Sequence, residues 1–138
     1  MIALRFLDTN ILLYSISRHS GEAAKREIAR ELLERDDCAL SVQVLQEFYV
    51  QATRPTRPDP LSHQIATGLI ESWLRFPIAE TTLSLVADAL AIKARHRFSY
   101  WDCAVISAAR ALGCGELLSE DMAHGREIEG VRIVNPFR

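Results

Sequence analysis

The first strand-like segment of the chain ends in a carboxylate, and this ending strongly constrains the fold. Residues 2–7 form a short, mostly apolar run, which Asp8, Thr9 and Asn10 close. A short apolar run bounded by turn-forming residues is typical of a buried strand, and parallel sheets bury both faces. Ligands of open α/β sheets bind beyond the carboxyl ends of the strands. Asp8 is therefore expected at the mouth of a site, unless it is only a turn residue or a helix cap.

Further strand-like segments follow the first, and helical patterns separate most of them. Residues 122–130 are expected to form a loop or a helical turn. The alternation predicts an α/β fold, with a mainly parallel sheet of about five strands, helices on both faces and right-handed crossovers. The other strands are expected over residues 38–40, 76–79, 116–118 and 131–134, and helices over 11–16, 22–35, 42–53, 61–74, from Thr81 or Thr82 to 96, and 104–112.

Capping and breaking residues support these boundaries. Asn10, Ser41 and Ser99 are expected to cap the helices that follow them. The proline-rich residues 54–60 cannot be helical and predict a loop. A proline within residues 76–79 favours an edge position for that strand.

Length and composition predict one domain that spans residues 1–138. No apolar run approaches the roughly 20 residues that cross a bilayer. Arg5 and Asp8 interrupt any apolar leader, so the expected location is the cytoplasm. The cysteines are odd in number and include no closely spaced pair, which favours reduced, buried thiols over disulfides or a zinc site: Cys38, Cys103 and Cys114.

Four acidic residues fall where the carboxyl edge of the sheet is expected. Asp8 ends the first strand, and Asp121 follows the strand at 116–118 by three residues. Asp102 lies in the first turn of a helix, and Glu47 lies in the helix after the second strand. The net charge of −2 does not indicate nucleic-acid binding by itself, but an enzyme that holds cations in an acidic cluster can be near neutral.

Converging carboxylates require a cation or protons between them. Each pair repels by about 4 kcal/mol at roughly 4 Å and an effective dielectric constant of about 20. Oxygen ligands without His or Cys favour Mg²⁺ or Mn²⁺. Such ions can activate water and stabilise the leaving oxygen of a phosphodiester. The pattern therefore indicates metal-dependent phosphoryl chemistry.

Each acid also has a purely structural interpretation. Asp8 and Asp102 can cap helices, and Asp121 can form an Asx-turn. Glu47 can belong to a solvated helix face. Glu120 adjoins Asp121 and is the alternative acid for the last position.

The segments that carry these acids resemble the motifs of PIN-domain ribonucleases, and among them those of the VapC-type toxins of toxin–antitoxin pairs. The four segments come in the family's order and span nearly the whole chain. They are Phe6-Leu7-Asp8-Thr9-Asn10-Ile11-Leu12, Ser41-Val42-Gln43-Val44-Leu45-Gln46-Glu47-Phe48, Ser99-Tyr100-Trp101-Asp102-Cys103-Ala104-Val105-Ile106-Ser107-Ala108-Ala109 and Leu118-Ser119-Glu120-Asp121-Met122-Ala123-His124-Gly125.

The resemblance implies a three-layer α/β/α fold and cleavage of RNA by one or two Mg²⁺ or Mn²⁺ ions that activate the attacking water. It also implies a homodimer and an antitoxin that inserts a segment near the metal site. Asn10 matches a polar residue that orients the first acid, although it can also be an N-cap, and Ser119 matches an assisting hydroxyl or is a simple turn residue. The implied metal ligands and catalytic residues are Asp8, Glu47, Asp102 and Asp121.

Contacts to RNA are hypotheses at this point. The basic candidates lie in the proline loop and before Asp102, although charge runs are often only solvated. Tyr100 and Trp101 can stack on bases, but aromatic residues beside a helix start often belong to the core. The basic candidates are Arg54, Arg57, Arg95 and Arg97, with Lys93 and His96 beside the last two.

Two other functions remain open. A phosphatase with a strand-end Asp nucleophile would be expected to carry a second Asp two residues later, where this chain has Asn10, and a supporting lysine, for which only Lys25 and Lys93 exist. The other alternative is a module that binds RNA or protein without cleavage.

Overall fold

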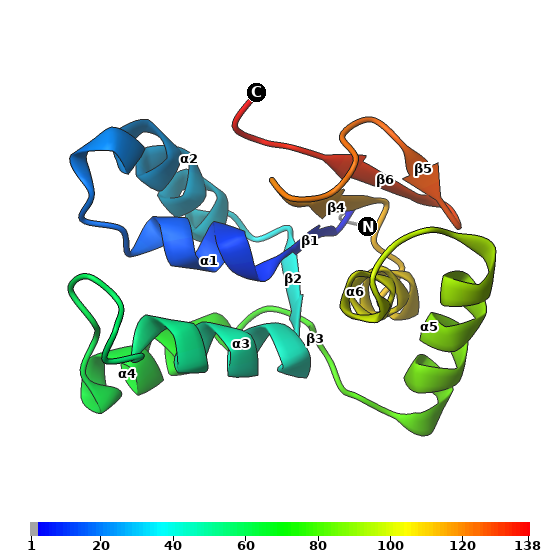
Figure 1. Cartoon of the computed structure of the whole chain (residues 1–138), viewed down its shortest axis with the longest axis horizontal. Helices are drawn as coiled ribbons and strands as arrows, with labels where there is room; N and C mark the ends of the chain where they lie inside the picture. The colour runs from blue at the N-terminus through cyan, green and yellow to red at the C-terminus, as the bar shows by residue number, and fades with distance from the viewer. Residues whose placement is uncertain (1–2) are drawn as a thin grey trace.

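The computed structural model describes residues 3–138 and has a six-stranded sheet between two groups of helices (Figure 1). The start of the first expected strand, Ile2, lies outside the described residues. The strands are β1 (Arg5–Leu7), β2 (Cys38–Ser41), β3 (Ile78–Ala79), β4 (Glu116–Leu118), β5 (Glu127–Ile128) and β6 (Val131–Val134). The helices are α1 (Thr9–Ser15), α2 (Ala23–Glu34), α3 (Val42–Ala52), α4 (His63–Trp73), α5 (Leu83–Arg95) and α6 (Tyr100–Ala111), with a 3₁₀ turn, η1 (Ser20–Glu22), before α2.

The strand order β3-β2-β1-β4-β6-β5 places β1 and β4 at the centre of the sheet. All neighbouring pairs are parallel except β5 and β6. In Figure 1, α1 to α4 lie on one side of the sheet, and α5 and α6 lie on the other. The helices that follow β1 and β2 therefore cover one side of the sheet, and those between β3 and β4 cover the other. The boundary between β1 and β4 is a topological switch point, and open α/β sheets bind ligands at such points.

The predicted fold class is confirmed, and most elements agree with their predicted ranges. The strands at 116–118 and 131–134 have the expected bounds, and β3 lies at an edge of the sheet. Ser41, Thr82 and Ser99 cap their helices as expected. The helix α6 begins earlier than predicted, at Tyr100, because Ser99 accepts a hydrogen bond from the backbone of Asp102.

The prediction that Asn10 caps the first helix is wrong. Asp8 keeps an extended backbone at the end of β1, and its carboxylate accepts a hydrogen bond from the backbone N–H of Thr9. The helix α1 therefore starts at Thr9, and Asn10 already lies in its first turn. The strand leads directly into the helix, which leaves no room for a later cap.

The sheet has one strand more than predicted, because part of the segment expected as loop forms β5. Glu127 and Ile128 pair with Arg132 and Val131 of β6 in an antiparallel hairpin. Its two-residue turn, Glu129–Gly130, has positive φ at both positions, as the turns that suit hairpins require. A two-residue strand in a polar segment is too short to give a periodic sequence signal.

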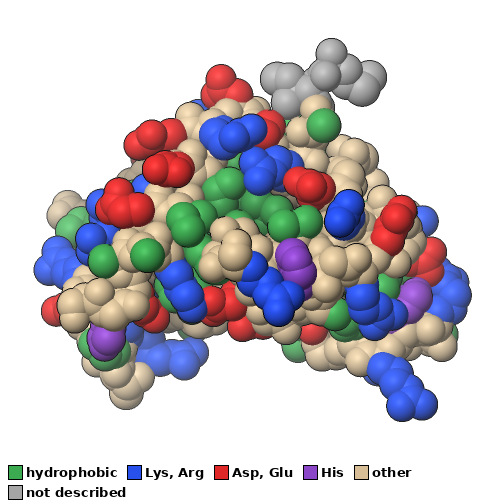
Figure 2. All heavy atoms as spheres, turned by 90° about the horizontal axis from the view of Figure 1, so that it is seen from above, with side chains coloured by type: hydrophobic (Ala, Val, Ile, Leu, Met, Phe, Trp, Pro, Cys, Tyr) green, Lys and Arg blue, Asp and Glu red, His purple; other side chains and the backbone are tan. Residues whose placement is uncertain are grey.

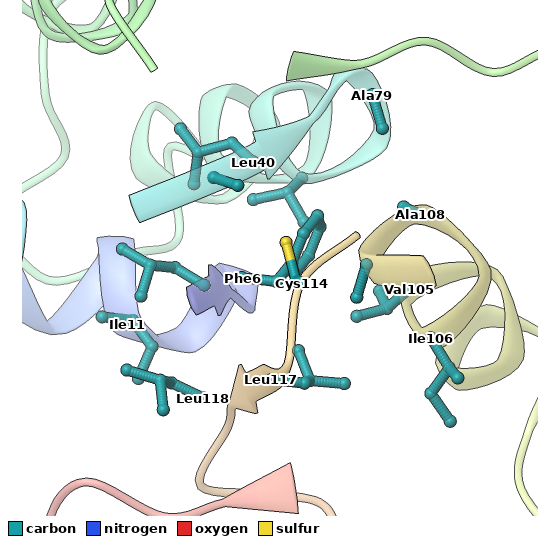
Figure 3. Packing of buried hydrophobic residues seen from close by; sticks show 14 of the residues in the cluster. Phe6, Ile11, Leu40, Ala79, Val105, Ile106, Ala108, Cys114, Leu117 and Leu118 are labelled. Atoms are coloured by element: carbon teal, nitrogen blue, oxygen red, sulfur yellow. The ribbon is translucent and has the colours of Figure 1, made fainter. Parts of the chain in front are cut away.

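The core lies on both faces of the central strands. Figure 3 shows Leu117 of β4 extending toward α6, while its neighbour Leu118 extends toward Ile11 of α1. This alternation is the two-residue period of a strand, and both leucines are fully buried. The cysteines are buried and free, as predicted. No helix among residues 3–138 combines the length and hydrophobicity needed to span a bilayer.

Leu117→Ala should lower the free energy of unfolding by about 2–5 kcal/mol, because it leaves a cavity in the central strand. Leu83→Ala is the matched control: Leu83 is 90% exposed, whereas Leu117 is fully buried. The control should change stability by no more than about 0.5 kcal/mol. Urea unfolding followed by circular dichroism measures both, and equal effects would contradict the described core.

Candidate active site

The fold brings the four sequence-predicted acids to the carboxyl edge of three neighbouring strands. Asp8 follows β1 directly, and Asp121 lies three residues beyond the end of β4. Ser41 ends β2 and caps α3, so Glu47 lies in the second turn of a helix that starts at the same edge. Asp102 lies in the first turn of α6.

Both oxygens of Asp8 accept hydrogen bonds. The backbone N–H of Thr9 donates to Oδ1 over 2.8 Å, and the hydroxyl of Ser119 donates to Oδ2 over 2.8 Å. Ser119 is fully buried at the end of β4, next to β1 in the sheet. The pairing of the two central strands therefore fixes the orientation of the Asp8 carboxylate.

Asn10 contacts the last acid of the cluster. Its Nδ2 donates to Oδ2 of Asp121 over 3.0 Å and to the hydroxyl of Ser119 over 3.3 Å. Its Oδ1 accepts the backbone N–H of Glu120 over 3.4 Å. The family resemblance implied that Asn10 orients the first acid, but here it reaches Asp8 only through Ser119.

Two residues not singled out from the sequence orient Glu47. The hydroxyl of Thr9 donates to Oε2 over 2.7 Å, and Nε2 of Gln43 donates to Oε1 over 2.9 Å. Thr9 is buried, and Gln43 lies one turn before Glu47 on α3. The four-residue spacing of Gln43 and Glu47 was a usable signal, whereas the Thr9 contact depends on the packing of α1 against α3.

Two carboxylates of the site, those of Asp8 and Asp102, have a raised pKa. Burial raises the pKa of Asp8 to about 6; the hydrogen bonds from Ser119 and Thr9 oppose this shift, and the charges of Asp102 and Glu47 add to it. Burial also raises the pKa of Asp102, opposed by the hydrogen bond at Ser99 and reinforced by the charges of Asp121 and Glu47. Asp8 and Asp102 thus each lie close enough to other acids of the cluster for the neighbouring charges to disfavour their ionised forms.

The cluster contains no cation of its own. Within residues 3–138, no Lys, Arg or His forms an ion pair with any of the four acids. Nor do any three His, Cys, Asp or Glu side chains in this range already stand close enough to enclose an ion. The donor chemistry nevertheless fits a hard divalent cation, because every candidate ligand is a carboxylate oxygen without a positive partner.

Glu120, the alternative acid, faces away from this cluster. Its carboxylate pairs with the ammonium of Lys25 and accepts a hydrogen bond from the hydroxyl of Tyr14. The ring of Phe137 packs edge-on against Tyr14, with 5.1 Å between the ring centres. Glu120 therefore anchors the loop after β4 to α1 and α2, next to Asp121 in the sequence.

The basic residues expected to meet RNA lie in two different places. Arg54 and Arg57 follow the far end of α3, and Arg57 lines a cavity with Arg18 and His19 beyond the far end of α1. The N-termini of both helices, by contrast, lie at the acid cluster. Figure 2 shows basic and acidic side chains interspersed over one face of the molecule, in line with the net charge of −2.

The second basic group precedes Asp102. Nε of Arg95 donates to Glu129 over 2.6 Å, and His96 lies 3.3 Å from the same carboxylate oxygen. These contacts attach the end of α5 to the turn between β5 and β6. Arg97 and Lys93 are exposed.

Comparisons with solved structures support the same fold. A toxin–antitoxin complex from Klebsiella pneumoniae contains a chain with a TM-score of 0.70 at 19% identity, over 96% of this chain and 97% of that one. VapC20 of Mycobacterium tuberculosis, a toxin that cleaves the sarcin–ricin loop, has a TM-score of 0.64 at 19% identity, over 85% and 91% of the two chains. The DNA-bound VapBC complex of Salmonella typhimurium has a TM-score of 0.66 at 19% identity, over 96% and 97%.

Sequence comparisons give a family but no individual relative. No curated protein matches the chain. The PIN domain family model matches residues 5–126. This range contains all four acids and most of the 138 residues. The chain therefore belongs to the PIN domain family.

Proposed function

We propose that this protein is a metal-dependent endoribonuclease that acts as the toxin of a toxin–antitoxin pair. The observation that carries the proposal is the meeting of Asp8, Glu47, Asp102 and Asp121 at the switch point of the sheet, with burial and mutual repulsion opposing ionisation of two of them. Such an arrangement is stable in its ionised form only with a cation among the carboxylates.

The four acids would hold one or two Mg²⁺ or Mn²⁺ ions. When bound, the ion supplies activation of water and stabilisation of the negative charge that develops on the phosphodiester. The chain itself fixes its carboxylates: Thr9 and Ser119 orient Asp8, and Asn10 orients Asp121. Because these hydrogen bonds already hold the carboxylates in place, the side chains would need to move little when a metal ion binds.

The partners follow from the same family relationship. The similar chains from Klebsiella and Salmonella belong to complexes with antitoxins, and the Mycobacterium toxin cleaves an RNA loop. The proposed partners are therefore an RNA substrate, a cognate antitoxin and a second copy of the chain. A basic residue of the antitoxin would neutralise the acid cluster, which forms no ion pair with the described part of this chain.

The structure gives less support to a phosphatase. The position two residues after Asp8 is Asn10, whose amide contacts Asp121 and Ser119. Lys25, one of the two lysines, pairs with Glu120 rather than with Asp8, and Lys93 is exposed on α5. Neither lysine contacts Asp8.

Asp8→Asn should abolish metal-dependent RNA cleavage, because it removes a charged ligand from the centre of the cluster. The loss of kcat/KM should exceed the roughly 10–100-fold typical of outer-shell partners. Asp36→Asn is the matched control, since Asp36 is exposed in the turn before β2, at the opposite edge of the sheet. Cleavage of a labelled RNA with Mg²⁺ or Mn²⁺ and with a chelator measures both variants.

Three outcomes decide between the candidate functions. Cleavage by Asp8→Asn at the wild-type rate would exclude the proposed site. A phosphoaspartate on wild-type Asp8 would indicate the phosphatase. RNA binding without cleavage by the wild-type protein would indicate a binding module.

Metal affinity should fall as the pH drops below the pKa of Asp8, about 6. In the metal-free protein this pKa lies above the ordinary aspartate value of 3.8, so ionisation of Asp8 destabilises the fold as the pH rises through about 6. The ion must displace the proton, and affinity at pH 5 should be about tenfold lower than at pH 8 if Asp8 dominates. Titration calorimetry with Mn²⁺ measures this dependence.

Ser119→Ala is the complementary variant for the same measurement. The Ser119 hydroxyl stabilises the ionised form of Asp8, so its removal should raise the pKa and move the pH midpoint of metal binding upward. A midpoint that stays in place would show that Asp8 does not control metal binding.

Asn10→Ala should reduce cleavage by about 10–100-fold at low metal concentration, because Asp121 loses its orienting partner. A higher Mg²⁺ concentration should restore much of this loss. Asn135→Ala, in the C-terminal tail, is the control and should behave as wild type. Failure of metal to rescue Asn10→Ala would indicate damage to the fold, which thermal unfolding would reveal.

A further inference from the structure

Trp101 is a large apolar side chain left in solvent beside the acid cluster. It is 63% exposed in the first turn of α6, immediately before Asp102. The residues from Cys103 to Ala109 on the same helix are all buried, and Tyr100 packs against the core. Of the two aromatic residues expected from the sequence to be core or stacking residues, only Tyr100 joins the core.

Trp101 lines a small cavity between α6 and α3. The cavity has a volume of about 270 Å³, and its other lining residues, Gln43, Gln46 and Glu47, belong to α3. Glu47 is also one of the four clustered acids, so the cavity adjoins the proposed metal site. Pockets for whole small molecules span about 300–1,000 Å³, and this smaller, solvent-open space suits one planar group.

The lining combines an aromatic ring with amide groups. Gln43 donates through Nε2 to Glu47, and its Oε1 makes no hydrogen bond within residues 3–138. Gln46 is exposed, and its side-chain amide also lacks a partner in the described part of the chain. An indole stacks on flat π-systems, and amides donate to and accept from the edges of heterocycles.

We propose that Trp101, Gln43 and Gln46 bind one unpaired nucleobase of the RNA, next to the phosphodiester that is cut. The proposal rests on the proposed ribonuclease function and adds a binding site for one base on three residues of this chain. A base inside a duplex has both faces covered by its neighbours and cannot stack on Trp101. The substrate is therefore single-stranded or looped at the cleavage site.

The polar lining favours a base over an apolar protein segment. An apolar side chain on Trp101 would cover Oε1 of Gln43 and the side-chain amide of Gln46 and leave these groups without hydrogen bonds. A nucleobase offers donors and acceptors along its edge as well as an apolar face. Its phosphate would in addition lie toward the acids, where the cation is proposed.

The test compares two short oligomers with the same 2′-O-methyl ribose–phosphate backbone, one carrying adenine at every position and one abasic. Wild-type protein should bind the adenine oligomer roughly 5- to 150-fold more tightly, since stacking on an aromatic side chain contributes about 1–3 kcal/mol per base. Trp101→Ala should bind both oligomers equally, and Trp101→Phe should retain part of the preference. Leu83→Ala, which removes another exposed apolar side chain, should behave as wild type.

Tryptophan fluorescence gives a direct readout of contact. The other tryptophan, Trp73, is 4% exposed and packs edge-on against Phe48. Quenching by the adenine oligomer, but not by the abasic one, should therefore report Trp101, and Trp101→Phe should lack it. With a cleavable RNA, Trp101→Ala should mainly raise KM rather than lower kcat.

Several results would overturn the proposal. One is equal binding of both oligomers by the wild-type protein; another is an undiminished preference for adenine in Trp101→Ala. Loss of dimers in Trp101→Ala, with no preference for adenine in wild type, would assign the residue to a subunit interface. The oligomer test requires no cleavage, so its result is separate from that of Asp8→Asn, which tests the ribonuclease function itself.

Discussion

The parallel pairing of β1 with β4 determines where the candidate site lies. Leu7 is in register with Leu118, and the backbone N–H of Asp8 donates to the carbonyl of Leu118 over 3.0 Å. This register places Asp8 beside Ser119 although 111 residues separate them in the chain. A shift by one residue would turn the buried leucines toward the wrong face, so the packing of the core also fixes the geometry of the acids.

The same arrangement has two opposing effects on the ionisation of Asp8. Burial and the neighbouring acids favour the neutral carboxyl group, while the hydrogen bonds from Thr9 and Ser119 favour the ionised one. Elsewhere in the molecule acidic side chains form ion pairs, as Asp88 does with Arg110. The acid cluster has no such partner within residues 3–138, and the proposal of a cation site rests on this contrast.

The sequence predicted the α/β fold and the edge at which the acids meet, because apolar periodicity reports which faces are buried. Asp8, Asp102 and Asp121 were predictable candidates from their positions after strands or in a first helical turn, and Glu47 from its position in the second turn of the helix after β2. The sequence did not predict that Asp8 rather than Asn10 caps α1, nor that Thr9 orients Glu47. Asp8 and Asn10 were both possible caps in the sequence, whereas the contact of Thr9 with Glu47 depends on the packing of α1 against α3, which local patterns do not contain. Similarly, the hairpin of β5 and the exposure of Trp101 follow from tertiary packing.

The hydroxyl of Ser119 has a single hydrogen, and its direction has a consequence for how the site can respond to change. That hydrogen points to Asp8, while the oxygen accepts from Asn10 and from the backbone N–H of Asp121. The hydroxyl therefore connects both Asn10 and the backbone of the last acid to the first acid, and every hydrogen in this chain is directed toward Asp8. An amide in place of the Asp8 carboxylate would offer one acceptor oxygen to two donors, the Ser119 hydroxyl and the Thr9 N–H, so even an isosteric replacement would set one of these donors against an NH2 group in addition to removing a charge.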